Sequence, residues 1–351
     1  MPQNVPNFNV WGVWKLLLVV GTFYSSVHLA LKPSTQFGLP TAEENKFHPL
    51  LIIPFKGWFE GSAPAKAPGL KFHTGPEHAW MQTLVSPAFA VGLPMLYLIS
   101  VMVGVRLQAN YGSSRKAFLK TYVQPVYNVV QIVVCAWMVW GLWPQDVFRN
   151  PFSLNSLPAK NIEFFVFVHY LTKYLDWFDT TFMILGHSFR QVSFLQVFHH
   201  ATIGMVWGLV LDAGWGSGTV QWGAFINSVT HVLLYSHYLW TSLGYTNPWK
   251  KHLFLFQLSQ FASCIVHAVL VFGGQALGTE NVYPTHLSYL QVMYHPVMIF
   301  LFATQLNWVP EWLVGEAATT VNRELSRVQG GEKGKKGKKV AGVVAATKKQ
   351  L

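Results

Sequence analysis

Seven stretches of this chain are apolar and long enough to cross a lipid bilayer, and this pattern limits its fold more than any other feature. They cover residues 79–105, 121–143, 161–185, 193–211, 218–243, 250–274 and 285–304. A spanning helix needs about 20 mostly apolar residues, and runs this long without strict alternation do not suit barrel strands. With 51% hydrophobic and only 11% charged residues, the chain is too apolar for a typical soluble protein. The sequence predicts an all-α integral membrane protein with about seven transmembrane helices.

The pattern divides the chain into three parts. Residues 1–78 contain an N-terminal hydrophobic segment, residues 10–31, followed by a Pro/Gly-rich connector. We expect that segment to be a membrane anchor or an interfacial helix. Residues 79–305 hold the seven spans, and residues 306–351 form a tail with seven lysines and no acid between positions 333 and 349. The stretch 333–349 contributes seven positive charges to a formal net charge of +11, which fits contact with anionic lipid and gives little support to nucleic acid binding.

Basic side chains collect on alternate connections between the spans. Residues 106–120 hold four of them and no acid, residues 186–192 hold Arg190, and the next such turn ends in Lys250 and Lys251. By the positive-inside rule these connections and the C-terminal tail face the cytoplasm. The last four residues, Lys348-Lys349-Gln350-Leu351, resemble the dilysine retrieval signal of endoplasmic reticulum proteins. We therefore predict a multi-pass endoplasmic reticulum membrane protein with a cytoplasmic C-terminus.

A polar stripe runs along the third predicted span. On a helix, His169, Lys173, Asp176 and Thr180 fall within an arc of about 60°, and Asp179 lies beside them. A charged side chain at bilayer depth costs roughly 2.5–3.5 kcal/mol, so such residues usually face a protein interior and serve a function. The alternative is a structural Lys173–Asp176 salt bridge that locks two helices together.

Two further polar faces follow on the next spans. On the fourth span Gln196 and His200 share a helix face and His199 lies to one side, and an adjacent histidine pair at membrane depth seldom serves packing alone. On the fifth span four polar side chains fall within an arc of about 80° and indicate a pocket lining. These four residues are Asn227, His231, Tyr235 and Tyr238.

The sixth span carries two amides three positions apart, Gln257 and Gln260, next to Lys250 and Lys251. The amides could belong to a functional site or could equally well hold two helices together by hydrogen bonds. The lysines could attract phosphates, but they also satisfy the positive-inside rule without any other role.

These elements, in this order, resemble the ELO family of very-long-chain and polyunsaturated fatty acid elongases. Residues 173–180 are similar to the family's K-x-x-[ED]-x-x-D-[ST] box, and residues 196–200 to its H-x-x-H-H box. Residues 227–238 resemble N-x-x-x-H-x-x-M-Y-x-Y-Y, and residues 254–260 resemble T-x-x-Q-x-x-Q. Gln196 stands in place of the first histidine, a variant that the resemblance associates with polyunsaturated-chain elongases. Leu234, His237 and Phe254 are further departures, which bear on substrate preference more than on reaction type.

The resemblance implies a fold and a reaction. The helices would surround an enclosed acyl tunnel, and acyl-CoA and malonyl-CoA would condense to 3-oxoacyl-CoA, carbon dioxide and CoA, with no bound cofactor and no metal. Expected partners are membrane lipid and the reductases and dehydratase of the elongation cycle, and a homo-oligomer is compatible with this activity. Neither cysteine, Cys135 or Cys264, is placed to serve as a nucleophile, so the family's proposed route is attack by a histidine imidazole on the thioester.

Roles for individual residues come with the same resemblance. His199 is the candidate nucleophile, His200 and His231 are acid/base or enolate-stabilising partners, and Asp176 or Asp179 would orient an imidazole. Lys173 would bind the malonyl carboxylate or pair structurally with Asp176. Candidate substrate-binding residues, including basic groups for the CoA phosphates, are Gln196, Asn227, Tyr235, Tyr238, Gln257, Gln260, Lys250, Lys251 and Arg106.

Two other protein classes remain alternatives. A membrane di-iron desaturase or hydroxylase also uses H-x-x-H-H and Q-x-x-H-H boxes, but its metal site needs about eight histidines in three clusters. This chain has a single His-His pair. A seven-span receptor or transporter fits the number of spans alone, since fold does not fix function. However, ligand binding by a receptor or transporter does not require a histidine pair beside an acidic stripe.

Overall fold

The computed structural model describes residues 69–144, 151–154, 156–277 and 285–305, and within these residues the chain is helical with no strand. The all-α fold is therefore confirmed. The N-terminal segment 10–31 and the lysine-rich tail 306–351 lie outside the described residues. The chain divides into two compact units, Met1–Met298 and Ile299–Leu351, and the bundle discussed below belongs to the first.

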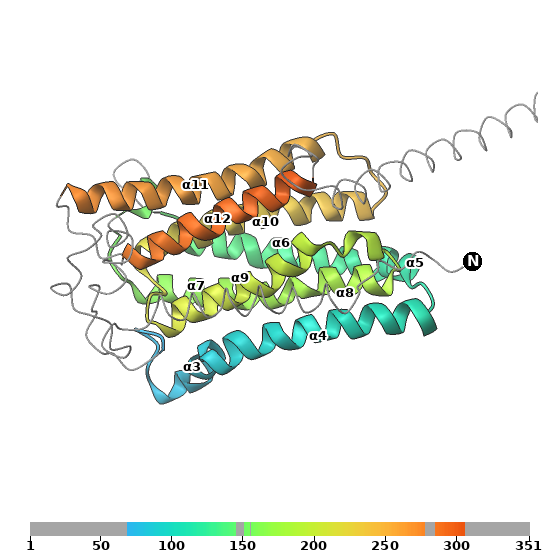
Figure 1. Cartoon of the computed structure of the whole chain (residues 1–351), viewed down its shortest axis with the longest axis horizontal. Coiled ribbons are helices and arrows are strands. Elements are labelled where there is room, and N and C mark those ends of the chain that lie inside the picture. Colours follow the sequence, from blue (N-terminus) through green and yellow to red (C-terminus); the bar gives the residue numbers. More distant parts are fainter. Residues whose placement is uncertain (1–68, 145–150, 155, 278–284, 306–351) are drawn as a thin grey trace, which may run out of the picture. The chain divides into compact units, whose positions relative to one another are not determined.

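The longer helices follow the predicted spans in order (Figure 1). They are α3 (Ala79–Val85), α4 (Pro87–Tyr111), α6 (Gln124–Gly141), α7 (Lys160–Leu175), α8 (Trp177–Leu185), α9 (Phe194–Asp212), α10 (Gln221–Ser242), α11 (Lys250–Ala276) and α12 (Thr285–Gln305). The shorter elements are η2 (Pro76–His78), α5 (Lys116–Phe118), η3 (Leu119–Val123), η4 (Pro151–Ser153), η5 (Phe189–Gln191) and η6 (Gly218–Val220).

Five described helical segments are long and apolar enough to cross a bilayer: Pro87–Tyr111, Lys116–Gly141, Phe194–Asp212, His252–Gly274 and Leu287–Thr304. The predicted spans at α7–α8 and α10 are not in this set. The first is shortened by a break between its two helices, and both carry the polar stripes identified in the sequence. The two predicted spans outside this set are thus the ones with the most polar side chains to bury inside the protein.

Helix α7 occupies the middle of the bundle. It packs against α6, α9 and α10, while α4 covers α8 and α9 on one side and α11 packs on α10 on another. A close approach of α4, α7 and α9 depends on Gly208, because a Cβ atom there would lie 2.6 Å from the Ala90 Cβ and 2.9 Å from a ring carbon of Tyr170. Among the polar residues of α7, Glu163, His169, Thr172 and Lys173 are buried within this packing.

Three predicted boundaries were wrong. The span 79–105 is two helices, because α3 ends at Val85 and α4 begins at Pro87. The span 161–185 is two helices, because α7 ends at Leu175 and α8 begins at Trp177, with Asp176 at the junction. The predicted loop 106–120 is largely helical: α4 continues to Tyr111, and the chain re-enters a helix at Lys116. A π-helical turn, η3, then precedes Pro125, whose missing backbone N–H interrupts the regular pattern.

The outer helices expose large apolar side chains, as expected for surfaces that face lipid. On α4 these include Leu96, Ile99 and Val103. Exposed aromatic residues cluster near helix ends, where they suit the interfaces between lipid and water. They include Trp80 at the start of α3, Trp140 and Trp143 at the end of α6, and Tyr111, Tyr122, Tyr245 and Trp249 near the turns that join α4 to α6 and α10 to α11.

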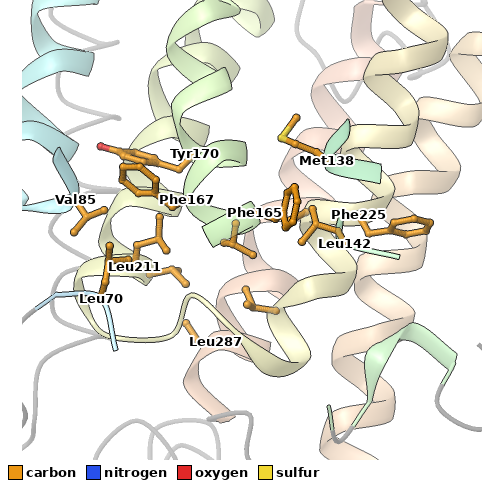
Figure 2. Close-up of a cluster of buried hydrophobic side chains, with 14 of the residues drawn as sticks. Leu70, Val85, Met138, Leu142, Phe165, Phe167, Tyr170, Leu211, Phe225 and Leu287 are labelled. Carbon is orange, nitrogen blue, oxygen red and sulfur yellow. The ribbon is translucent and has the colours of Figure 1, made fainter. Parts of the chain in front are cut away.

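A cluster of buried apolar side chains joins helices α3, α6, α7, α9, α10, α11 and α12 (Figure 2). It includes Val85, Met138, Phe167, Leu211 and Leu287, and Leu70 extends it to the segment that precedes α3. Burial of this kind contributes about 25 cal/mol per Å² of apolar surface where the alternative environment is water. The cluster fixes the relative positions of helices that also carry the polar site.

Glu163 ties the segment before α3 to helix α7. Its carboxylate is fully buried and accepts hydrogen bonds from the backbone N–H groups of Lys71, Phe72 and His73, at 2.7, 2.8 and 3.1 Å. The His73 Nδ1 atom lies 2.9 Å from the same carboxylate. Hydrogen bonds to a charged group each contribute about 1.5–3 kcal/mol, so this end of the connector is firmly attached to the bundle.

Candidate active site

The break between α7 and α8 places a buried ion pair in the middle of the bundle. Lys173 Nζ lies 3.4 Å from Asp176 Oδ2 and donates a hydrogen bond of 2.8 Å to Asn227 Oδ1 on α10. Lys173 and Asp176 are only 2% and 4% exposed. At this burial an unpaired charge would cost several kcal/mol, so each ion depends on the other. The predicted pairing of Lys173 with Asp176 is present, together with a partner from a different helix.

Tyr235 links the two carboxylates of the acidic stripe. Its hydroxyl lies 3.0 Å from Asp176 Oδ1 and 2.8 Å from Asp179 Oδ2, and its single proton can be donated to only one of them at a time. The His231 Nδ1 atom is 3.7 Å from Asp176 Oδ1. Of the two carboxylates of the acidic stripe, Asp176 is therefore the one beside the His231 imidazole, while Asp179 is held through Tyr235.

Helix α6 contributes two residues that the sequence analysis missed. Gln131 is fully buried, and its Nε2 atom lies 3.0 Å from Asp176 Oδ1, 3.2 Å from Tyr235 OH and 2.9 Å from Tyr127 OH. Tyr127 OH in turn donates to the backbone carbonyl of Leu175 at the end of α7. The available signal was their spacing, because Tyr127 and Gln131 lie on one face of an otherwise apolar helix at i and i+4.

The histidine pair lies on α9 beside this network. Gln196 Nε2 is 3.1 Å from His200 Nε2, so the two residues share a helix face as predicted. The backbone carbonyl of His200 accepts a hydrogen bond of 3.0 Å from the Trp177 indole at the start of α8. Among the described residues, His200 Nδ1 is buried without a hydrogen-bond partner. A buried ring nitrogen of this kind is available to a substrate atom.

His199 faces a cavity between helices α9, α10, α11 and α12. The cavity has an empty volume of about 710 Å³, including its opening, and most of its wall is apolar. Its polar residues include Asn227, the partner of Lys173, so the cavity and the buried ion pair share one side chain. The complete lining is His199, Ile203, Val206, Trp207, Val210, Val220, Gly223, Asn227, Gln260, Phe261, Cys264, Leu287, Leu290, Gln291, Tyr294 and His295.

Helix α12 supplies cavity residues that the sequence analysis did not identify. Tyr294 OH lies 3.4 Å from His199 Nδ1, and Gln291 Oε1 lies 3.0 Å from His267 Nδ1 on α11. The His295 Nδ1 atom is 2.9 Å from the backbone carbonyl of Gln291. Residues 291, 294 and 295 form an i, i+3, i+4 face, a signal that was present in the sequence.

Several predicted site residues lie apart from this arrangement. Gln260 lines the cavity, but Gln257 does not. Tyr238 is 38% exposed, although its ring packs edge-on against Tyr235. Arg106 is exposed on α4 and Lys250 is exposed on α11. The two helices have different neighbours, because α4 packs on α3, α8 and α9, whereas α11 packs on α10. The side chain of Lys251 lies outside the described residues.

The described residues contain no group of three or more His, Cys, Asp or Glu side chains placed to hold a metal ion. The polar network described above is built instead from an ion pair, tyrosine hydroxyls, amides and single imidazoles. Such groups can orient a substrate, move protons and offer a nucleophilic nitrogen.

Comparison with known proteins shows the family to which the chain is similar. The model of the ELO family, described as the GNS1/SUR4 family, matches residues 82–306. "Fatty acid elongase 5" of Trypanosoma cruzi is 41% identical over 222 residues, which cover 63% of this chain and 84% of that protein. "Fatty acid elongase 5" of Leishmania major is 39% identical over 225 residues, covering 64% and 86%. "Very long chain fatty acid elongase 4" of Mus musculus is 27% identical over 279 residues, covering 72% and 85%.

Proposed function

The chain belongs to the ELO family of fatty acid elongases, and we propose that it catalyses the condensing step of elongation. In this reaction acyl-CoA and malonyl-CoA give 3-oxoacyl-CoA, carbon dioxide and free CoA. One observation carries the proposal: His199 lines a largely apolar cavity whose wall also includes Asn227, the hydrogen-bond partner of Lys173. An acyl chain would occupy the apolar part, with its thioester beside the imidazole.

The first half of the proposed mechanism is acyl transfer to His199. The imidazole attacks the thioester carbonyl, a C–N bond forms, the C–S bond breaks, and CoA leaves as the thiolate. A neutral imidazole is a competent nucleophile near pH 7, and the covalent intermediate divides one difficult step into two. The Nδ1 atom of His200 has no hydrogen-bond partner among the described residues, and we assign it the role of donating a hydrogen bond to the developing oxyanion.

In the second half malonyl-CoA loses carbon dioxide, and its enolate carbon attacks the acyl group. The new C–C bond forms as the C–N bond to His199 breaks, which regenerates the imidazole. We assign enolate stabilisation to His231 and its electrostatic orientation to Asp176, whose Oδ1 atom lies 3.7 Å from His231 Nδ1, beyond the length of a hydrogen bond. The distances favour Asp176 over Asp179 for this orienting role. They also favour a structural role for Lys173, as the partner of Asp176 and Asn227, over the alternative that Lys173 binds the malonyl carboxylate.

The remaining assignments complete the proposal. We expect the reaction to need no bound cofactor, we assign the positioning of substrate oxygens to Gln196 and Tyr235, and Gln260 lies on the cavity wall. Polyunsaturated acyl-CoA is the proposed substrate class, because Gln196 replaces the first histidine of the H-x-x-H-H box. Lys250, Lys251 and Arg106 would attract CoA phosphates at the cytoplasmic side, and the other enzymes of the cycle would receive the 3-oxoacyl product.

The decisive experiment is expression in a yeast host that is fed saturated, monounsaturated and polyunsaturated fatty acids, followed by gas chromatography of total fatty acids. We expect products two carbons longer than the fed polyunsaturated acids, and none of these in cells with an empty vector. Products of unchanged length with an additional double bond would contradict the condensing activity. Elongation confined to saturated acids would leave that activity intact and overturn the proposed substrate class.

We propose that the protein resides in the endoplasmic reticulum membrane with its C-terminus in the cytoplasm. The support is the Lys348-Lys349-Gln350-Leu351 terminus and the distribution of basic residues. Replacing Lys348 and Lys349 by serine is expected to move the protein out of the endoplasmic reticulum while microsomal elongation stays unchanged. Fluorescence microscopy against an endoplasmic reticulum marker checks this, with Lys338 and Lys339 replaced in the same way as the control. Retention of the first variant would show that the two terminal lysines are not a retrieval signal.

A further inference from the structure

The imidazole of His199 is contacted by a residue outside the four sequence boxes. Tyr294 on α12 is 3% exposed, and its hydroxyl lies 3.4 Å from His199 Nδ1. The same hydroxyl lies 3.1 Å from the Oγ1 atom of Thr202, one turn along α9 from His199. Three polar groups thus form a chain, from the imidazole through the phenol to the threonine hydroxyl.

The direction of the hydrogen bonds in this chain follows from its far end. Thr202 Oγ1 lies 2.8 Å from the backbone carbonyl oxygen of Phe198, which can only accept. The single hydroxyl proton of Thr202 is therefore committed to that carbonyl, and its oxygen accepts from Tyr294. The Thr202 oxygen lies 3.1 Å from the phenol and His199 Nδ1 lies 3.4 Å from it, so we direct the phenol proton at the nearer atom, Thr202, and the Tyr294 oxygen then accepts a hydrogen bond from His199. This requires a proton on His199 Nδ1.

We propose that Tyr294 and Thr202 are positioning residues that hold His199 as the Nδ1–H tautomer and leave Nε2 as the attacking nitrogen. The inference rests on the proposed acyl transfer to His199. The Nε2 lone pair forms the C–N bond, the C–S electron pair leaves with the CoA sulfur, and the Nδ1 proton stays on the ring. The positive charge that appears on the acylated imidazole is stabilised at Nδ1–H by the Tyr294 oxygen.

The first test measures acylation of His199 directly. Purified protein is mixed with acyl-CoA in the absence of malonyl-CoA, the reaction is quenched at intervals, and the acylated His199 peptide is quantified by mass spectrometry. The Tyr294→Phe variant keeps the ring and removes the acceptor, so its histidine is free to adopt the other tautomer. We expect acylation to slow by about 10- to 100-fold, with the KM for acyl-CoA within about two-fold of wild type.

The second test changes the far end of the chain. In Thr202→Val the phenol loses its acceptor and turns its proton toward His199 Nδ1, which would leave the proton of the ring on Nε2. We expect the rate of His199 acylation to fall by a similar factor as in Tyr294→Phe. Thr202→Ser keeps a hydroxyl, so its acylation rate is expected to be close to that of wild type. Thr230→Val on α10 is the matched control, because Thr230 makes the same bond to the carbonyl four residues earlier, at 2.8 Å.

The outcomes separate this inference from the proposed function. A wild-type protein that elongates fatty acids but never acylates His199 would overturn the covalent route itself. A wild-type protein that acylates His199, with Tyr294→Phe acylating at the same rate, would overturn the tautomer inference alone. Equal losses in Thr202→Val and Thr230→Val would also overturn it, because they would reflect packing. Thermal unfolding of each variant in detergent identifies any loss that comes from misfolding.

Discussion

Replacing His199 by alanine is expected to abolish elongation while the protein still folds and inserts into the membrane. His199 lines the cavity and is the proposed covalent nucleophile, so its loss removes the first chemical step. Removal of a covalent nucleophile lowers kcat by roughly 10³-fold or more, because the remaining groups can bind substrate but cannot form the intermediate. The measurement is the rate of 3-oxoacyl-CoA formation by purified protein at saturating acyl-CoA and malonyl-CoA.

Two further histidine variants sharpen this prediction. His200→Ala is expected to lower kcat strongly as well, but an acylated His199 should still be detectable, since the nucleophile remains. His252→Ala is the matched control, because His252 is exposed on α11, and its activity should equal that of wild type. Full activity in His199→Ala would remove the nucleophile assignment, and acylation of His200 in that variant would transfer the role to His200.

Replacing Asp176 by alanine is expected to cause the largest loss of stability of any single substitution in the site. Asp176 is 4% exposed and pairs with Lys173, which is also buried. Breaking a buried pair by removing one partner costs about 3–5 kcal/mol, because the remaining charge is left without compensation. The variant should therefore unfold at a lower temperature and lose activity, as measured by thermal unfolding and condensation assays in detergent.

A double variant distinguishes the structural role of this pair from its role in catalysis. Lys173→Met combined with Asp176→Leu removes both charges and is expected to recover most of the stability, since apolar side chains of similar volume often replace a buried ion pair without loss. Activity should stay absent, because His231 no longer has an orienting carboxylate at 3.7 Å. Recovery of activity would mean that the pair serves only to hold helices together. Glu77→Ala, at an exposed carboxylate before α3, provides the control for stability.

The sequence by itself determined the helical fold and most of the residues of the candidate site. Apolar runs of about 20 residues can satisfy their backbone polar groups in a membrane only as helices, so the class followed from length and composition. Helical periodicity then placed Gln196 with His200 on one face, and the pairing of Lys173 with Asp176 at i, i+3 was visible for the same reason. Each of these relations lies within a few residues of the chain.

The tertiary structure decided which of these faces meet. The bonds from Gln131 to Tyr235 and from Tyr294 to His199 join residues 104 and 95 positions apart, and no local pattern identifies such partners. The attachment of residues 71–73 to Glu163 is equally remote in sequence. Periodicity specifies the side of a helix that is polar, but the helix it faces depends on the packing of the whole bundle. For this reason the sequence identified the histidines and acids, and only the structure showed that α6 and α12 complete their surroundings.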